Sequence, residues 1–152
     1  MIRAKKRLGD MLIEAKLITE EQLNEALQYG RSNSKKLGES LIDLRFIDEK
    51  ELLAELAKQL NLEQVQLTGI DIPNELVGLV NVSVLRKNLM IPYAYVKDSI
   101  TQVKLAMADP MDMKAIDDFT IITNMQVQPV IAPTADILVT LDMYYGDKEA
   151  MK

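Results

Sequence analysis

Cysteine, histidine and tryptophan are absent from this 152-residue sequence. Without cysteine the chain has no thiol nucleophile, no disulfide and no thiolate ligand for a metal. Without histidine it lacks the side chain that most often exchanges protons near neutral pH, binds metals or activates a serine. The glycine-rich patterns GxxxxGK[ST] and GxGxxG, which hold nucleotide phosphates, are also missing. We therefore expect a chain that is not itself an enzyme.

Long apolar runs are missing too, since none approaches the roughly 18 residues that cross a bilayer. The basic start, residues 1–7, leads into a segment that carries Asp10 and Glu14, which is not typical of a signal peptide. The content of 48% apolar and 27% charged residues is that of a globular protein. We expect a cytoplasmic chain with no direct membrane insertion.

Charge is spread unevenly along the sequence. Residues 1–60 hold 11 basic and 11 acidic residues, whereas residues 61–152 hold 7 basic and 12 acidic ones. The acidic excess argues against nucleic acid as a partner. Two basic clusters in the first part, residues 3–7 and the group Arg31, Lys35 and Lys36, have enough charge to neutralise a ligand with one or two phosphates. The alternative is that they are solvated helix ends.

Segment 1–60 contains an internal repeat. The stretch 7–13 (RLGDMLI) is echoed by the stretch 36–42 (KLGESLI). The offset between the two copies stays constant over many positions, which is typical of a repeated supersecondary unit. Apolar residues recur at matching positions, namely Leu17 with Phe46, Ile18 with Ile47, Leu23 with Leu52 and Leu27 with Leu56.

Each repeat is predicted to form a helix, a tight connection and a second helix, because its apolar residues recur at helical spacing. Thr19 with Gln22, and Asp48 with Glu51, have the spacing of capping boxes at the starts of the second helices. The polar segment 32–34 is predicted to connect the two helical hairpins.

Gly9 and Gly38 fall near the first turn of a helix in their repeats. Glycine there leaves backbone N–H groups uncovered at the positive end of the helix, which suits a phosphate or a carbonyl-rich base edge. Alternatively, each glycine permits close packing of two helices. The residues alone leave both interpretations open.

The second half predicts a small ββαβα domain. After a connector at 61–72, we expect short helices at 73–80 and 83–87, strands at 89–96 and 100–108, a helix at 113–122, a strand at 125–131 and a helix at 133–145. The predicted class is α+β, with residues 1–60 forming tandem helical hairpins of four helices and residues 73–152 forming the small α/β domain. Asp109 lies at a strand-to-helix turn, where it either accepts hydrogen bonds from a guanine or caps the next helix.

The repeated unit resembles the motif RLGxxLxxxGxLxxxxLxxxLxxQ of the MshE N-terminal domain family, which precedes the motor of type II secretion and type IV pilus assembly ATPases. The segment 103–112 (VKLAMADPMD) is similar to another part of that family. The resemblance implies a bacterial signalling domain that binds cyclic di-GMP, needs no other cofactor, and belongs to a parent ATPase whose motor is not in this chain. It also implies that the chain is an excised N-terminal domain.

The resemblance further implies a ligand site in which each motif holds half of the ligand. A cation stacks on or near a guanine, the Leu-Gly backbone meets polar ligand atoms, and the leucines form an apolar floor. The matching residues are Arg7, Leu8, Gly9, Leu12, Leu23 and Leu27 in the first motif, Lys36, Leu37, Gly38, Leu41, Leu52, Leu56 and Gln59 in the second, and Asp109 beyond the repeat.

The chain departs from the motif at four positions. Gly30 stands where the first motif ends in glutamine, and Lys36 replaces arginine in the second motif. Lys16 and Arg45 replace an internal glycine, so the turns of both repeats are expected to differ slightly. Gln28 and Tyr29 are candidates to replace the missing glutamine.

These departures keep a second hypothesis open. In it the chain is a docking module that binds no nucleotide and links the ATPase to an inner-membrane assembly protein through its acidic second half.

Overall fold

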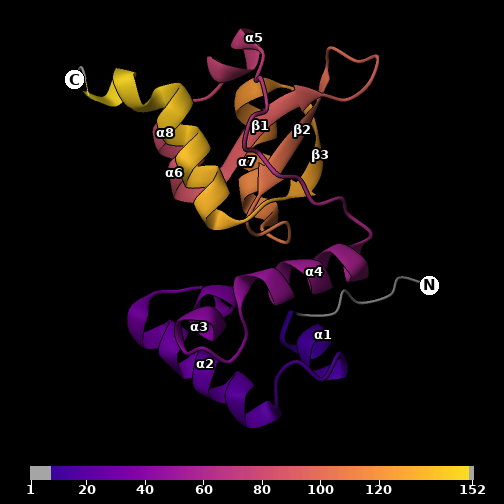
Figure 1. The fold of residues 1–152 in the computed structure, drawn as a ribbon, viewed down its shortest axis with the longest axis vertical. Coiled ribbons are helices and arrows are strands. Elements are labelled where there is room, and N and C mark those ends of the chain that lie inside the picture. The colour runs from indigo at the N-terminus through magenta and orange to yellow at the C-terminus, as the bar shows by residue number, and fades with distance from the viewer. Residues whose placement is uncertain (1–7, 151–152) are drawn as a thin grey trace. The chain divides into compact units, whose positions relative to one another are not determined.

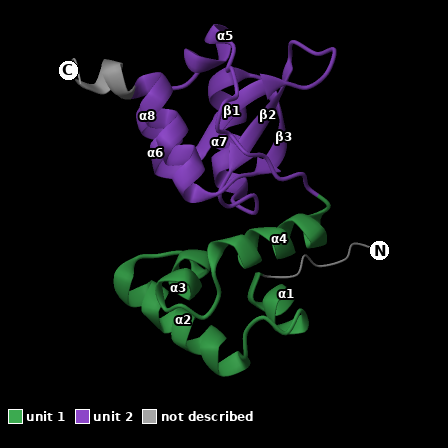
Figure 2. Ribbon diagram, in the orientation of Figure 1, with its two compact units in different colours: residues 1–61 green, residues 62–152 purple. Residues whose placement is uncertain are grey.

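The computed structural model describes residues 8–150, and the chain divides between residues 61 and 62 into two compact units (Figures 1 and 2). The first unit is helical, and the second combines helices with a three-stranded sheet. The α+β class is therefore confirmed. Among the described helices, none combines the length and the apolar character needed to cross a membrane.

The first unit contains the predicted helices as two short-then-long pairs. They are α1 (Leu8–Glu14), α2 (Glu20–Asn33), α3 (Leu37–Asp43) and α4 (Glu49–Leu60).

Both predicted capping boxes begin the long helices. The Thr19 hydroxyl accepts from the Gln22 amide at 3.1 Å, and the Gln22 side chain accepts from the Thr19 amide at 3.0 Å. Asp48 and Glu51 exchange the same pair of hydrogen bonds at 2.8 and 3.4 Å. Two amides that would otherwise lack a partner are satisfied at each helix start.

The short helices end in a shared backbone motif. Lys16 and Arg45 have φ values of 64° and 63°, the left-handed conformation that glycine adopts most easily. In α1 the amides at 16 and 17 donate to the carbonyls at 13 and 12, and in α3 the amides at 45 and 46 donate to those at 42 and 41. This is the Schellman pattern. Although lysine and arginine stand where the motif has glycine, the turns of both repeats are left-handed.

The connection between the hairpins is shorter than predicted, because α2 continues through residues 32 and 33. The Asn33 side chain donates to the Tyr29 carbonyl at 2.8 Å, which satisfies an acceptor of the last turn. The helix ends only at Ser34, which is left-handed with a φ of 54°. The predicted connector at 32–34 was wrong for its first two residues.

The core of the first unit consists of apolar side chains from both repeats. Several of them occupy equivalent positions of the two copies, and the fully or nearly buried ones are Met11, Leu12, Ile18, Ala26, Leu41, Ile47, Leu52, Leu53 and Leu56.

The second unit has the predicted ββαβα order behind two short helices. Its elements are α5 (Asn74–Val77), α6 (Val82–Asn88), β1 (Met90–Tyr95), β2 (Gln102–Met107), α7 (Met113–Thr123), β3 (Gln126–Ile131) and α8 (Thr134–Ala150).

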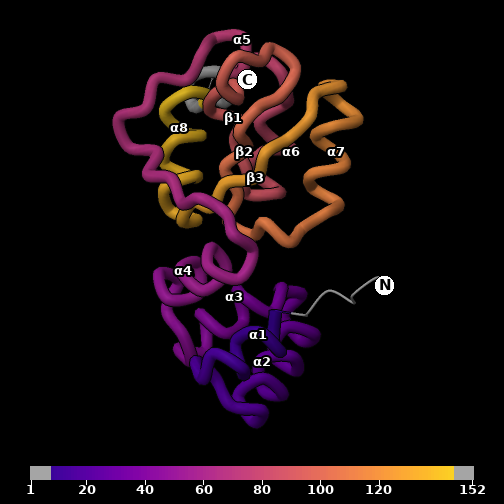
Figure 3. The backbone as a smooth tube through the Cα atoms, turned by 90° about the vertical axis from the view of Figure 1, so that its right-hand side faces the viewer, coloured from indigo at the N-terminus to yellow at the C-terminus, as the bar shows by residue number. Residues whose placement is uncertain are grey.

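Strand β2 is the centre of the sheet, antiparallel to β1 and parallel to β3. Helices α7 and α8 lie on opposite sides of the strands (Figure 3). The side chains of β2 from Leu105 to Met107 are fully buried between them. Pro92 and Pro129 lie on the outer strands, where a missing N–H costs least.

The segment predicted as a connector is bound along its length to the second unit. The Val65 amide donates to the Ile131 carbonyl at 2.8 Å. The Asp136 carboxylate accepts from the Leu67 amide at 3.0 Å. The Tyr144 hydroxyl accepts from the Ile72 amide and donates to the carbonyl of Ile70, at 3.1 and 2.9 Å. These bonds hold the segment against β3 and α8.

Candidate functional site

The two repeat glycines pack against leucines at equivalent places. Gly9 and Gly38 are the second residues of α1 and α3. A methyl group on Gly9 would lie 2.7 Å from the Leu23 Cδ1 atom, and one on Gly38 would lie 3.3 Å from the Leu52 Cδ2 atom. Each leucine belongs to the long helix of the same repeat. The structure thus gives both glycines the packing role that the sequence left open, and the binding role of their amides stays a prediction.

The leucines predicted to form the apolar surface of the ligand site fall into two groups by solvent exposure. Four of them are core residues with at most 5% of their surface exposed, namely Leu12, Leu41, Leu52 and Leu56. Four others reach the surface, namely Leu8, Leu23, Leu27 and Leu37. Only the second group is accessible to a ligand in this conformation, because the first group lies in the core.

An open hollow of about 220 Å³ lies between α2 and the start of α3. Its walls come from both repeats, and its lining residues are Ala26, Leu27, Gly30, Arg31, Lys35 and Leu37. Leu27 and Leu37 are predicted site residues. The structure therefore brings parts of the two motifs together around one concave surface.

The backbone at Lys35 lies very close to Gly30. A methyl group at this position would lie 2.7 Å from the Lys35 carbonyl oxygen and 2.9 Å from the Ser40 hydroxyl. A glutamine side chain cannot start there unless α3 moves away from α2. Gln59, its counterpart in the second repeat, is exposed and donates to the Glu55 carboxylate at 2.6 Å.

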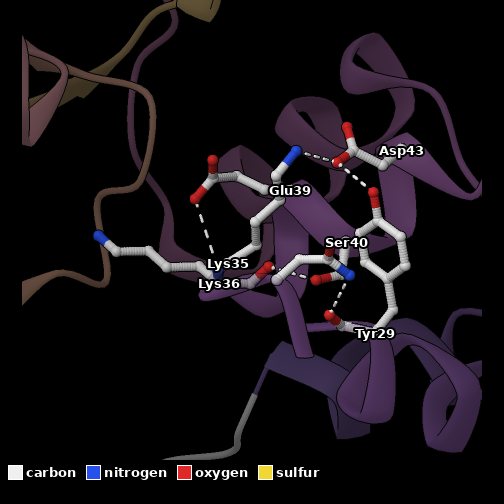
Figure 4. A network of polar contacts seen from close by, with 7 residues as sticks. Tyr29, Lys35, Lys36, Glu39, Ser40 and Asp43 are labelled. Atoms are coloured by element: carbon white, nitrogen blue, oxygen red, sulfur yellow. Dashed lines mark hydrogen bonds and ion pairs between the residues drawn. The ribbon is translucent and has the colours of Figure 1, made fainter. Parts of the chain in front are cut away.

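Next to Gly30, a small network of polar contacts links α2, α3 and the segment between them (Figure 4). The Tyr29 hydroxyl donates to the Asp43 carboxylate at 3.1 Å, and the Lys35 ammonium group forms an ion pair with the same carboxylate. The hydrogen bond to Asp43 raises the pKa of Lys35, and the hydrogen bond from Lys35 lowers the pKa of Asp43. Because the Tyr29 hydroxyl is already bound to Asp43, it is poorly placed to replace the missing glutamine.

The cations of the predicted site lie in different surroundings. Arg7 falls outside the described residues. The Lys36 amide donates to the Glu39 carboxylate at 3.4 Å, and its side chain points away from Asp43 (Figure 4). Arg31, which the motif does not include, lines the hollow directly. In the sequence, Arg31 and Lys35 could be found as members of a basic cluster. The cluster did not show which of its members face a concave surface.

Asp109 belongs to the second unit and follows β2 by two residues. Its carboxylate accepts from the Met111 amide at 3.1 Å, which closes a tight turn. The cap of α7 is Asp112, whose carboxylate accepts from the Ala115 amide at 3.1 Å. The capping role considered for Asp109 was therefore wrong, since α7 begins three residues later than that role requires.

Comparison with known proteins finds relatives over most of the chain. The type IV pilus assembly ATPase PilB of Myxococcus xanthus is 29% identical over 142 residues, and PilB of Thermus thermophilus is 26% identical over the same length. Each comparison covers 93% of this chain but only 25% and 16%, respectively, of the relative.

Solved structures share the fold. A structure of MshE with cdg (cyclic di-GMP) aligns with a TM-score of 0.76 and 31% identity, covering 93% of this chain and 100% of that one. The N-terminal domain of XpsE aligns with a TM-score of 0.78 and 20% identity, covering 93% of this chain and 97% of that one, which shows likeness of fold.

The family itself is identified by the match of residues 60–151 to the MshEN domain. That region is more than half of the chain, and the alignment with MshE extends the likeness to the helical repeat. The chain belongs to the MshEN domain family.

Proposed function

We propose that this chain is a regulatory domain of a type IV pilus assembly or type II secretion ATPase and that its helical repeat binds cyclic di-GMP. The observation that carries the proposal is the likeness to the structure of MshE with cdg, at 31% identity over the whole of that chain. The internal repeat supports it, because a two-fold dinucleotide calls for two similar half-sites, and the repeat supplies two matching helical hairpins.

The accessible leucines of the repeat supply apolar surface for the guanine bases. Arg7 and Lys36 precede the two repeat glycines and are the cations assigned to stack on or near the bases. Asp109 lies in the second unit, and its role as an acceptor for guanine N–H groups is a separate prediction from the family resemblance. Ligand contacts with both hairpins would favour one arrangement of the hairpins, and only such differential binding shifts a conformational equilibrium.

Calorimetric titration of the chain with cyclic di-GMP tests the proposal, with GTP as the control nucleotide. We expect saturable heat with cyclic di-GMP and none with GTP. Absence of heat at high concentrations of both protein and cyclic di-GMP would defeat the proposal.

The two motif cations provide a finer test. Arg7→Ala is expected to weaken binding more than Lys36→Ala, by about tenfold, because only arginine has a planar guanidinium that stacks on a purine. Titration of both variants measures this difference. Equal losses of affinity would contradict the assignment of Arg7 as the stacking cation.

A docking module without nucleotide binding is the second candidate. Gly30 favours it, because the approach of the Lys35 carbonyl excludes the glutamine that the motif places at this position. The acidic second half, with 7 basic and 12 acidic residues, offers a surface for a basic partner at the inner membrane. Pull-down of an inner-membrane assembly protein by a chain that gives no heat with cyclic di-GMP would favour this candidate.

A further inference from the structure

The hollow beside Gly30 marks a difference in surface chemistry between the two repeats. Position 30 has no side chain and lies at the wall of the hollow, whereas its counterpart, Gln59, carries an exposed amide. The first half-site therefore lacks a hydrogen-bonding side chain at this position and borders a concave surface. A ligand group that enters the hollow must find its polar contacts on another residue.

The walls of the hollow suit a flat ring. Leu27 and Leu37 contribute apolar surface from two different helices, and Leu27 is 36% exposed; Ala26 also lines the hollow but is itself buried. Apolar side chains on two sides favour the faces of a planar base and leave its polar edge to be satisfied separately. A phosphate would need several free N–H donors around it, and of the two cations in the lining Lys35 is already paired with Asp43.

Two cations line the hollow, and they differ in their partners. Lys35 is neutralised by Asp43 and lies with its ammonium nitrogen 6.0 Å from the centre of the Tyr29 ring. Arg31 is exposed in the last turn of α2, and within the described part of the chain its guanidinium has no hydrogen-bond or ion-pair partner. Arg31 is thus the lining residue whose donors are available to a ligand.

We propose that the hollow holds one guanine base of the cyclic dinucleotide and that Arg31 reads the O6 and N7 acceptors of that base, so that Arg31 determines the preference for guanine over adenine. The inference rests on the proposed function. The guanidinium presents two parallel N–H groups, which match the two acceptors of guanine. Adenine places an amino group where guanine has O6, so one donor of Arg31 would face another donor and lose its partner.

The test compares cyclic di-GMP with cyclic di-AMP on the unmodified chain and three variants. Arg31→Ala removes the donors, Arg31→Lys keeps the charge without the fork, and Lys50→Ala removes a cation of α4 that does not line the hollow. Calorimetry gives both affinities for each protein, and circular dichroism checks that each variant is folded.

We expect Arg31→Ala to lower the affinity for cyclic di-GMP about tenfold and to change the affinity for cyclic di-AMP little, so that the preference for guanine falls about tenfold. Arg31→Lys is expected to lose most of the same preference, and Lys50→Ala is expected to keep it. Raised salt should leave the preference of the unmodified chain nearly unchanged, because a base edge releases no counterions.

The outcomes separate the two proposals. If the unmodified chain binds no cyclic di-GMP, the proposed function fails and this inference falls with it. If it binds and Arg31→Ala keeps the full guanine preference, only the inference fails. Equal losses for both ligands, restored by Arg31→Lys, would show that Arg31 contacts a phosphate and would overturn its assignment to the base.

Discussion

The two repeats of the helical unit share their backbone motifs and differ in the side chains that their long helices bury. Both have a capping box before the long helix, a left-handed residue after the short helix, and a glycine packed against a leucine of the long helix. The long helices differ, since α2 buries Ala26 and Gly30 whereas α4 buries three leucines.

This difference explains where a concave surface forms. The capping boxes and the left-handed turns depend on backbone geometry within a few residues, so the same local rules produce them in both repeats. Small residues in α2 let the chain at Lys35 come close and leave Leu27 partly exposed at the edge of the hollow. In α4 the equivalent Leu56 is 3% exposed. A duplicated unit thus becomes asymmetric through side-chain volume, while its backbone motifs stay alike.

The largest predicted effect tests this asymmetry at the equivalent leucines. Leu56→Ala is expected to destabilise the helical unit by about 3 kcal/mol, because it removes a buried side chain and leaves a cavity. Leu27→Ala is expected to cost about 1 kcal/mol, since the residue is already 36% exposed. Amide hydrogen exchange in α2 and α4 reports the stability of this unit separately from the other. Similar losses for the two variants would contradict the assigned asymmetry.

A smaller effect is expected at the next equivalent pair. Gly30→Ala places a methyl group against a backbone carbonyl, which moves less easily than the end of a flexible side chain, and it should cost about 2 kcal/mol despite the better helix propensity of alanine. Gln59→Ala should cost less than about 0.5 kcal/mol, because the side chain is exposed. The same exchange measurement applies. A neutral Gly30→Ala would mean that α3 moves away easily and that a glutamine is tolerated at this position.

Local signals were enough to predict most of the fold. The helical and strand periodicities located the helices and strands of both units, and the capping boxes were found from spacing alone. Segment 61–72 was predicted only as a connector, because the residues that anchor it are remote in sequence. Tyr144 binds the backbone at Ile70 and Ile72, far earlier in the chain, and no pattern within the segment signals such a bond.

The candidate site was less predictable than the fold, for a related reason. The motif names residues by spacing, but burial decides which of them a ligand can touch. Leu12 and Leu27 are both motif leucines, yet the first is fully buried and the second lies at the hollow. Arg31 lies outside the motif and was visible only as part of a charge cluster. Its position depends on the contact between Gly30 and Lys35, which brings the end of α2 close to the start of α3.

An effect smaller than that of Gly30→Ala is expected at the backbone turns that the two repeats share. Lys16 and Arg45 are left-handed, a conformation that costs a residue with a Cβ atom about 1 kcal/mol relative to glycine. Each is compared as its glycine and alanine variants, because both variants lose the charge near the helix end and differ only in backbone freedom. The glycine variant should be the more stable by about 1 kcal/mol at both positions, as measured by hydrogen exchange in the adjacent short helix. If the difference appears at one position only, the turns are not equivalent, and the asymmetry of the repeats extends from side-chain volume into the backbone.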